Sequence, residues 1–183
     1  MFIFKMKSSR ILYFVLTVLS VVYLNTTAVQ AEQYSTGSHT ITTTQGLLIV
    51  NVGHVSHFNA HDFFVYSFMF QPKGSKEWHQ LSHVEKEDDP KMLFTIQTKH
   101  SADRDLFDAK IISDKRKIQL VTANMETGET LADDGPVILT TYDLVKLADY
   151  ERWVFLRKNI KRIAPKASVE NLLKHVAPSR EKK

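Results

Sequence analysis

Short apolar blocks separated by polar turn residues run through most of the chain after residue 31, and this pattern predicts strands rather than helices. Several of the blocks are rich in β-branched or aromatic residues, which pack well on a pleated sheet. All glycines and prolines follow residue 31 and fall mainly between the blocks, where turns need them. The predicted strands are 38–44, 47–52, 63–71, 77–84, 92–98, 109–113, 117–122 and 137–142.

The predicted strand 63–71 is the densest in aromatic residues. With a period of two, one face holds Phe64, Tyr66, Phe68 and Phe70, and the other holds Phe63, Val65, Ser67 and Met69. Because both faces are largely apolar, the pattern favours a central strand that is covered on both sides. A strand that faces the inside of a ligand-holding barrel or cleft is the alternative.

The clearest hairpin pairs 109–113 with 117–122 across the short polar connection 114–116. Together with the other blocks, this spacing predicts about seven or eight antiparallel strands. We therefore expect a mainly β fold, a β-sandwich or a barrel-like sheet, that ends in a C-terminal α-helix.

That helix is predicted to begin at Ser168, a suitable N-cap, and to end before Pro178. Its apolar positions have helical spacing and are Val169, Leu172, Leu173 and Val176. The preceding region 143–163 is compatible with two structures. Its apolar residues fit a helical stripe, but the block Trp153–Leu156 also fits a buried strand.

The first 31 residues have the pattern of a secretory signal peptide that is cleaved. Their basic residues are Lys5, Lys7 and Arg10. The nearly unbroken apolar run 11–24 follows, and Ala28 and Ala31 are the small residues that signal peptidase needs before a cut at Glu32. An uncleaved membrane anchor is the alternative, although the run is shorter than the ~20 residues of a spanning helix.

Cleavage there leaves one globular domain, residues 32–178, and a disordered tail, residues 179–183. The expected location is the bacterial periplasm, with secretion as the alternative, and no stable membrane insertion is expected after cleavage. The chain has no cysteine, so neither disulfides nor thiol chemistry contribute. Because three of its 24 basic residues lie in the leader, the exported domain is nearly neutral, which argues against nucleic acid as a partner.

Histidine is the most unusual component, with eight in the chain, all after residue 31. The candidate binding residues are His54, His57, His61 and Asp62. Spacings of three and four residues let the three imidazoles reach one centre, and imidazole is a good ligand for zinc or copper. Asp62 fits a further ligand or an acceptor that orients a ring. His79 and His83 are expected to approach the same region. The opposing interpretation is a polar loop that simply contains histidines.

A second polar cluster spans 100–108 and contains His100, Asp103, Asp105 and Asp108. Its carboxylates suit calcium or acid–base chemistry, although the glycine and distal glutamate of an EF-hand loop are missing. The favoured interpretation is a solvated loop in which Arg104 pairs with the neighbouring Asp103 and Asp105. No Gly-x-Ser-x-Gly elbow or phosphate-binding glycine loop occurs, so no catalytic residue is predicted.

Basic residues gather near the end of the chain, at Arg152, Arg157, Lys158, Lys161, Arg162 and Lys166. A solvated face around a buried stripe is favoured over contact with anionic lipid or an acidic partner.

Three functions follow. The favoured one is a small exported, non-catalytic binding or accessory protein that docks an unknown periplasmic protein or sequesters a small molecule, a protective role included, with no cofactor. The alternatives are a periplasmic protein that binds zinc or copper through His54, His57 and His61, and a small hydrolase.

Overall fold

The computed structural model describes residues 34–56, 62–101, 104–114, 117–130, 133 and 135–177. The chain separates into two units, Met1–Gln30 and Ala31–Lys183, and all the described residues lie in the second unit. The predicted leader and the predicted tail therefore fall outside the described residues. Within the described ranges, no helix is long and apolar enough to cross a membrane.

The described part of the chain is mainly β, as predicted, and ends in the short helix α2 (Val169–His175). It contains ten strands rather than seven or eight. They are β1 (Gly37–Thr42), β2 (Gly46–Val55), β3 (Phe63–Pro72), β4 (His79–Val84), β5 (Thr95–Gln97), β6 (Lys99–His100), β7 (Asp105–Ser113), β8 (Ile118–Met125), β9 (Val137–Leu147) and β10 (Arg152–Ile163).

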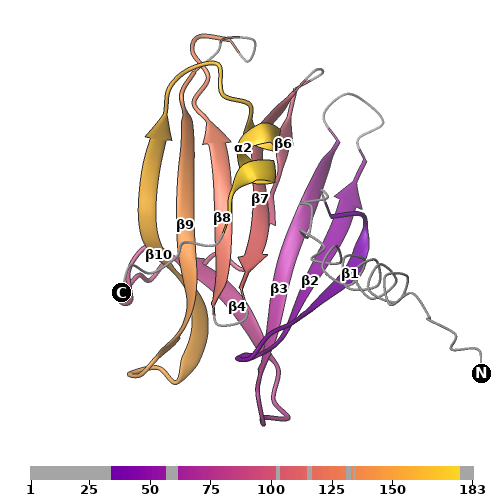
Figure 1. Ribbon diagram of the computed structural model, residues 1–183, viewed down its shortest axis with the longest axis vertical. Coiled ribbons are helices and arrows are strands. Elements are labelled where there is room, and N and C mark those ends of the chain that lie inside the picture. The colour runs from indigo at the N-terminus through magenta and orange to yellow at the C-terminus, as the bar shows by residue number, and fades with distance from the viewer. Residues whose placement is uncertain are drawn as a thin grey trace, which may run out of the picture. The chain divides into compact units, whose positions relative to one another are not determined.

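The strands form one curled sheet with the order β1-β2-β3-β4-β10-β9-β8-β7-β6, and β5 pairs with β3. Figure 1 shows β1–β3 facing β7–β10, with β4 passing between the two groups. The pairing of β4 with β10 is parallel, which corrects the expectation of antiparallel strands alone. A parallel pair needs a long crossover connection, and here β5 to β9 supply it.

The segment 95–100 joins the two ends of this curl. Its first half, β5, pairs with β3, and its second half, β6, pairs with β7. Between them, Thr98 exchanges bonds with Phe64: the Thr98 N–H donates to the Phe64 carbonyl (2.9 Å), and the Phe64 N–H donates to the Thr98 Oγ1 (2.9 Å). The strands therefore form a ring in the order β3-β4-β10-β9-β8-β7, which residues 95–100 complete between β7 and β3. The strands β1 and β2 continue the sheet beyond β3, outside this ring. We call 95–100 the closing segment.

The main core contains residues from the strands of this ring and from β2. It consists of Leu48, Val50, Val52, Tyr66, Phe68, Phe70, Leu81, Ile96, Ala109, Ile111, Ile118, Leu120, Leu144 and Phe155. The even-numbered aromatic face of β3 supplies three of these residues, whereas the opposite face is only half-buried. The prediction that β3 is covered on both sides is thus correct for one face only, because within the described residues no element packs over the outer face.

The helix α2 covers the outer face of β7 and β8. Val169 and Leu173 are buried there, next to Val121 and Ala123. As predicted, Ser168 is the N-cap, and its Oγ accepts the Asn171 N–H at 3.3 Å. A seven-residue helix is too short to be stable alone, so this apolar packing holds it in place.

The ambiguous region 143–163 contains the end of β9, a turn and β10, and β10 pairs with β9 along eleven residue pairs. The buried block at Val154 and Phe155 continues the sheet, so the strand interpretation is correct. By contrast, the predicted strand 92–98 is mostly irregular. Only Thr95–Gln97 is a strand, and Met92, Leu93 and Phe94 are each about 40% exposed.

Candidate functional site

An open pocket of about 410 Å³ lies where the N-terminal end of the described chain meets β2 and β3. Its lining residues are Tyr34, Ser35, Thr36, His54 and Phe64. Two aromatic side chains and an imidazole form its walls, and two hydroxyl residues supply polar groups. The volume of this pocket lies within the range of small-molecule sites, although such sites usually enclose more of their ligand.

The pocket contains part of the predicted histidine site. His54 and Phe64 are opposite each other in the β2–β3 ladder, and their rings lie 5.1 Å apart. The Nε2 of His54 lies 3.4 Å from the Oδ2 of Asp62, so the structure brings these two predicted residues together.

The rest of the predicted histidine cluster is not assembled in the described residues. His57 and His61 lie outside them. His79 pairs with Phe70, at the opposite end of β3 from Phe64, and His83 packs against Tyr142 and pairs with Leu93. The expectation that His79 and His83 approach His54 is therefore wrong. Among the described residues, no group of three potential ligands gathers around one point.

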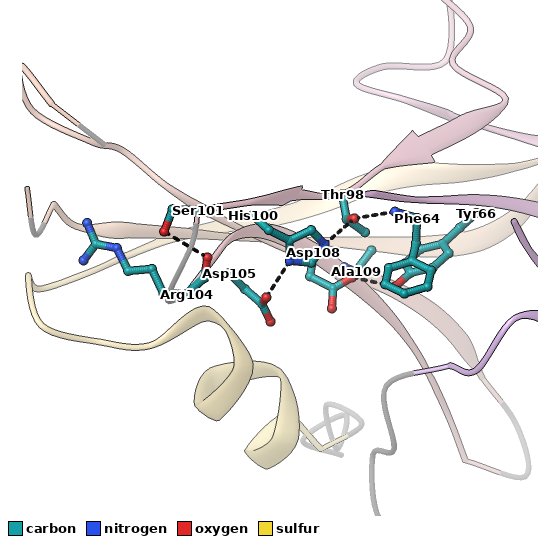
Figure 2. A network of polar contacts seen from close by, with 9 residues as sticks. All are labelled: Phe64, Tyr66, Thr98, His100, Ser101, Arg104, Asp105, Asp108 and Ala109. Carbon is teal, nitrogen blue, oxygen red and sulfur yellow. Dashed lines mark hydrogen bonds and ion pairs between the residues drawn. The ribbon is translucent and has the colours of Figure 1, made fainter. Parts of the chain in front are cut away.

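A second polar cluster lies beside the pocket, on the closing segment (Figure 2). The Nδ1 of His100 lies 2.7 Å from the Oδ1 of Asp105, and its Nε2 lies 2.8 Å from the Oγ1 of Thr98. Asp105 only accepts, so Nδ1 is the donor, and in the neutral ring Nε2 accepts the Thr98 hydroxyl proton. The cluster reaches the pocket through Phe64, whose amide binds Thr98 and whose ring lies 6.1 Å from that of His100.

The order hydroxyl, imidazole, carboxylate is the order of a catalytic triad. Here, however, Thr98 is only 1% exposed, and its oxygen already accepts the Phe64 amide proton. A nucleophile must be reached by its substrate, and this hydroxyl is enclosed by the closing segment and β3. The contacts instead connect Phe64 on β3, Thr98 on the closing segment and Asp105 on β7, so the arrangement stabilises the closure of the ring.

Beyond the end of β6, the edges of β3 and β7 face each other with no described strand between them. We call this boundary the seam. Two side-chain oxygens replace that strand: the Asp108 Oδ1 accepts the Ala109 N–H (2.7 Å), and the Tyr34 Oη accepts the Ile111 N–H (3.3 Å). The Tyr66 hydroxyl also donates to the Asp108 Oδ1 (2.9 Å; Figure 2). Edge amides that lack a strand partner need such acceptors when they are buried.

Burial shifts the pKa values of Asp108, Tyr34 and Tyr66. It raises the pKa of Asp108 from 3.8 to about 6, although the hydrogen bonds from Ala109 and Tyr66 act in the opposite direction. Burial also raises the pKa of Tyr34 to about 12 and the pKa of Tyr66 further, with the Asp108 charge adding to both. Both tyrosines therefore stay neutral and act as hydrogen-bonding groups rather than as bases.

The second half of the region 100–108 is thus not part of the predicted solvated loop, because β7 begins at Asp105. Leu106 and Asp108 are buried, and Asp105 contacts His100 rather than serving as the expected partner of Arg104. The guanidinium of Arg104 donates to the Asp133 carbonyl (3.0 Å), and Asp103 lies outside the described residues. The importance of Thr98 was missed, because a threonine in a predicted strand has no distinguishing sequence pattern.

The basic residues near the C-terminus lie mainly along β10. Lys158 and Lys161 are exposed, and Arg157 and Arg162 form ion pairs with Glu85 (2.9 Å) and Glu126 (2.7 Å). This distribution agrees with the favoured interpretation of a solvated surface.

The described residues define a class of small β domains: a curled, nearly closed sheet with one C-terminal helix. Among solved structures, the crystal structure of CarG is similar to it, with a TM-score of 0.62, 19% sequence identity, and coverage of 79% of this chain and 94% of that one. At this identity the likeness concerns the fold alone. No family model matches the chain, and no curated protein sequence matches it.

Proposed function

We propose that the protein is a small exported, non-catalytic binding or accessory protein that takes up a small molecule in the pocket beside His54 and Phe64. The pocket of about 410 Å³ is the observation that carries this proposal. Export to the periplasm rests on the leader pattern of residues 1–31, and secretion is the alternative location.

The wall composition indicates the kind of molecule. Tyr34 and Phe64 present ring surfaces, which suit a planar apolar group. His54, positioned by Asp62, and the hydroxyl residues Ser35 and Thr36 suit a hydrogen-bonding group next to it. Sequestering such a compound would protect the cell in which the protein resides. Docking of a periplasmic protein at the same place is the related role.

Rigid walls favour binding because little freedom is lost when the ligand enters. The Tyr34 ring lies 6.1 Å from the Tyr66 ring, and its hydroxyl is bound to β7. Phe64 is held through its amide by Thr98, which His100 and Asp105 position in turn. In this proposal the triad-like contacts serve to preorganise the pocket.

A thermal-shift screen of the purified protein with small aromatic compounds tests the proposal. A compound that binds the native state raises the melting temperature. Thr36→Trp, which fills the pocket from an exposed position, should remove the rise, whereas Thr40→Trp, at an exposed position of β1 outside the pocket, should retain it. The proposal fails if no compound raises the melting temperature, or if Thr36→Trp responds like the unchanged protein.

A second candidate function is the binding of zinc or copper, and the contact between His54 and Asp62 favours it. His57 and His61 remain candidate ligands by their spacing alone. Zinc at 100 times its dissociation constant should stabilise the protein by about 2.7 kcal/mol. Loss of this stabilisation in His54→Ala, but not in His175→Ala on α2, would support a site here; an equal response of both variants would contradict it.

A further inference from the structure

A second surface lies away from the pocket, near the turn between β9 and β10. Three consecutive large apolar residues are exposed there: Met92 by 39%, Leu93 by 43% and Phe94 by 43%. Tyr150, in the turn itself, is 57% exposed. Leu93 forms a backbone bridge with His83, so the side chains of Met92 and Phe94 lie on the side opposite to that of Leu93. We call Met92, Phe94 and Tyr150 the apolar surface, because exposed apolar residues that are grouped in this way are a feature of interaction sites.

The apolar surface is held in a defined shape. Leu93 exchanges backbone hydrogen bonds with His83 on β4, with N···O distances of 2.8 and 3.4 Å. Arg152 connects Met92 to the turn, because its guanidinium contacts the Met92 sulfur and lies 4.9 Å from the centre of the Tyr150 ring. These side chains are therefore positioned by β4 and β10 rather than by the irregular segment alone.

A pocket of about 350 Å³ adjoins this surface at Tyr150. Its other lining residues are Glu87, Asp88, Leu147, Ala148 and Asp149. Leu147 belongs to the buried cluster with Val84 and Val154, which gives the pocket a firm apolar floor. All its charged lining residues are carboxylates. Lys86 pairs with Asp88 at 3.3 Å, whereas Glu87 and Asp149 have no ion pair within the described ranges.

The apolar surface and the adjoining carboxylate-lined pocket together determine which kind of partner can bind here. We propose that this surface docks a segment of a partner protein that inserts a lysine or arginine into the pocket and lays neighbouring apolar side chains on Met92 and Phe94. The opposite charges orient the segment, and the apolar contacts supply most of the affinity. This site is independent of the small-molecule pocket, so either proposal can fail without the other.

An NMR titration of the ¹⁵N-labelled protein with a short peptide of alternating lysine and leucine tests the proposal. Chemical-shift changes should be confined to residues 87–94 and 147–152. A lysine–serine peptide and a glutamate–leucine peptide should each bind at least about fivefold more weakly, because one lacks the apolar part and the other the charge. Equal binding of all three peptides, or shifts spread over the surface, would overturn the proposal.

Variants at the surface provide the second part of the test. Glu87→Gln with Asp149→Asn should weaken binding about fivefold to tenfold at low salt and little at high salt. Phe94→Ser should weaken it similarly at both salt concentrations. Ile160→Ser, at a 51% exposed position of β10, is the matched control and should bind like the unchanged protein. Concentration-dependent shifts of residues 87–94 without peptide would overturn the proposal in favour of a second copy of the chain.

Discussion

The sheet is completed in two physically different ways, on the two sides of β7. On its outer face, α2 packs apolar side chains such as Leu173 against the cluster around Val121. At its edge, towards β3, the closing segment and the side chains of Tyr34, Tyr66 and Asp108 make polar contacts. We call these two regions the helix cover and the polar seam.

The difference follows from what each region must satisfy. A sheet face presents side chains, and apolar burial stabilises it without directional requirements. A sheet edge presents backbone N–H and C=O groups, which need partners at defined positions. The helix cover should therefore contribute more stability per residue, whereas the polar seam determines geometry, including that of the neighbouring pocket.

The largest effect is expected in the helix cover. Leu173→Ala removes a side chain that is 5% exposed and leaves a cavity between α2 and the sheet, which should lower the free energy of unfolding by about 2–5 kcal/mol. Urea denaturation measures this change. Leu172→Ala, on the same helix but only half-buried, is the control and should cost less. If Leu173→Ala lowered the free energy of unfolding less than a variant of the polar seam did, the helix cover would not be the more stabilising region.

The next largest effect is expected from a substitution of Asp108, which should raise the free energy of unfolding rather than lower it. The folded pKa of about 6 lies above the unfolded value of 3.8, so the folded state binds more protons between these values, and stability falls as the pH rises through this window. Above pH 7 the buried charge costs up to about 3 kcal/mol. Asp108→Asn keeps an oxygen for Tyr66 and Ala109, and should therefore stabilise the protein at pH 7.5 by about 1–3 kcal/mol.

Unfolding in urea at pH 4, 5, 6 and 7.5 checks this prediction. The difference between Asp108→Asn and the unchanged protein should grow with pH, and Glu129→Gln, at an exposed position, should follow the unchanged protein. A destabilised Asp108→Asn at pH 7.5 would show that the seam requires the charge itself.

An effect of similar size, but a loss of stability, is expected from Thr98→Val, which preserves shape but removes the hydroxyl. The Phe64 amide and the His100 Nε2 then lose their partner in a buried place, which should cost about 1–3 kcal/mol. Hydrogen exchange of the Phe64 amide should accelerate. Thr95→Val, an exposed position of the same segment, should change stability by less than about 0.5 kcal/mol. Unchanged exchange at Phe64 would show that the polar cluster does not hold the closing segment.

The smallest effect is expected at the N-cap of α2. Ser168→Ala removes the oxygen that accepts the Asn171 N–H and should cost about 1 kcal/mol, whereas Ser168→Asn should retain most of the stability. Thermal unfolding measures both. A loss as large as that of Leu173→Ala would indicate that capping, rather than apolar packing, holds the helix cover.

Local pattern predicted the elements of the helix cover well. Two β-branched blocks around a short polar connection identified β7 and β8 with their hairpin, and the spacing of Val169, Leu172, Leu173 and Val176 identified α2. These succeed because a face is a repeating property of neighbouring residues. The polar seam was not predicted, since Thr98, Asp105 and Tyr66 become partners only when β3, the closing segment and β7 meet.

The candidate site shows the same division. The sequence selected His54 and Asp62, which lie close in the chain and do meet, but it wrongly added His79 and His83. Tyr34 was not recognised as a pocket wall, and a ligand-holding cleft was only the alternative for the face of Phe64, because aromatic residues have the same pattern whether they line a core or a pocket.

The sequence by itself therefore determined that the chain after its leader-like start is mainly β and ends in one amphipathic helix, because periodicity records which faces are buried. Only the tertiary structure decided that the sheet curls back on itself, that β4 pairs in parallel with β10, and that residues 95–100 join β3 to β7. Pairing between distant strands depends on backbone hydrogen bonds, which every residue except proline can make, and so it leaves little trace in the order of the side chains.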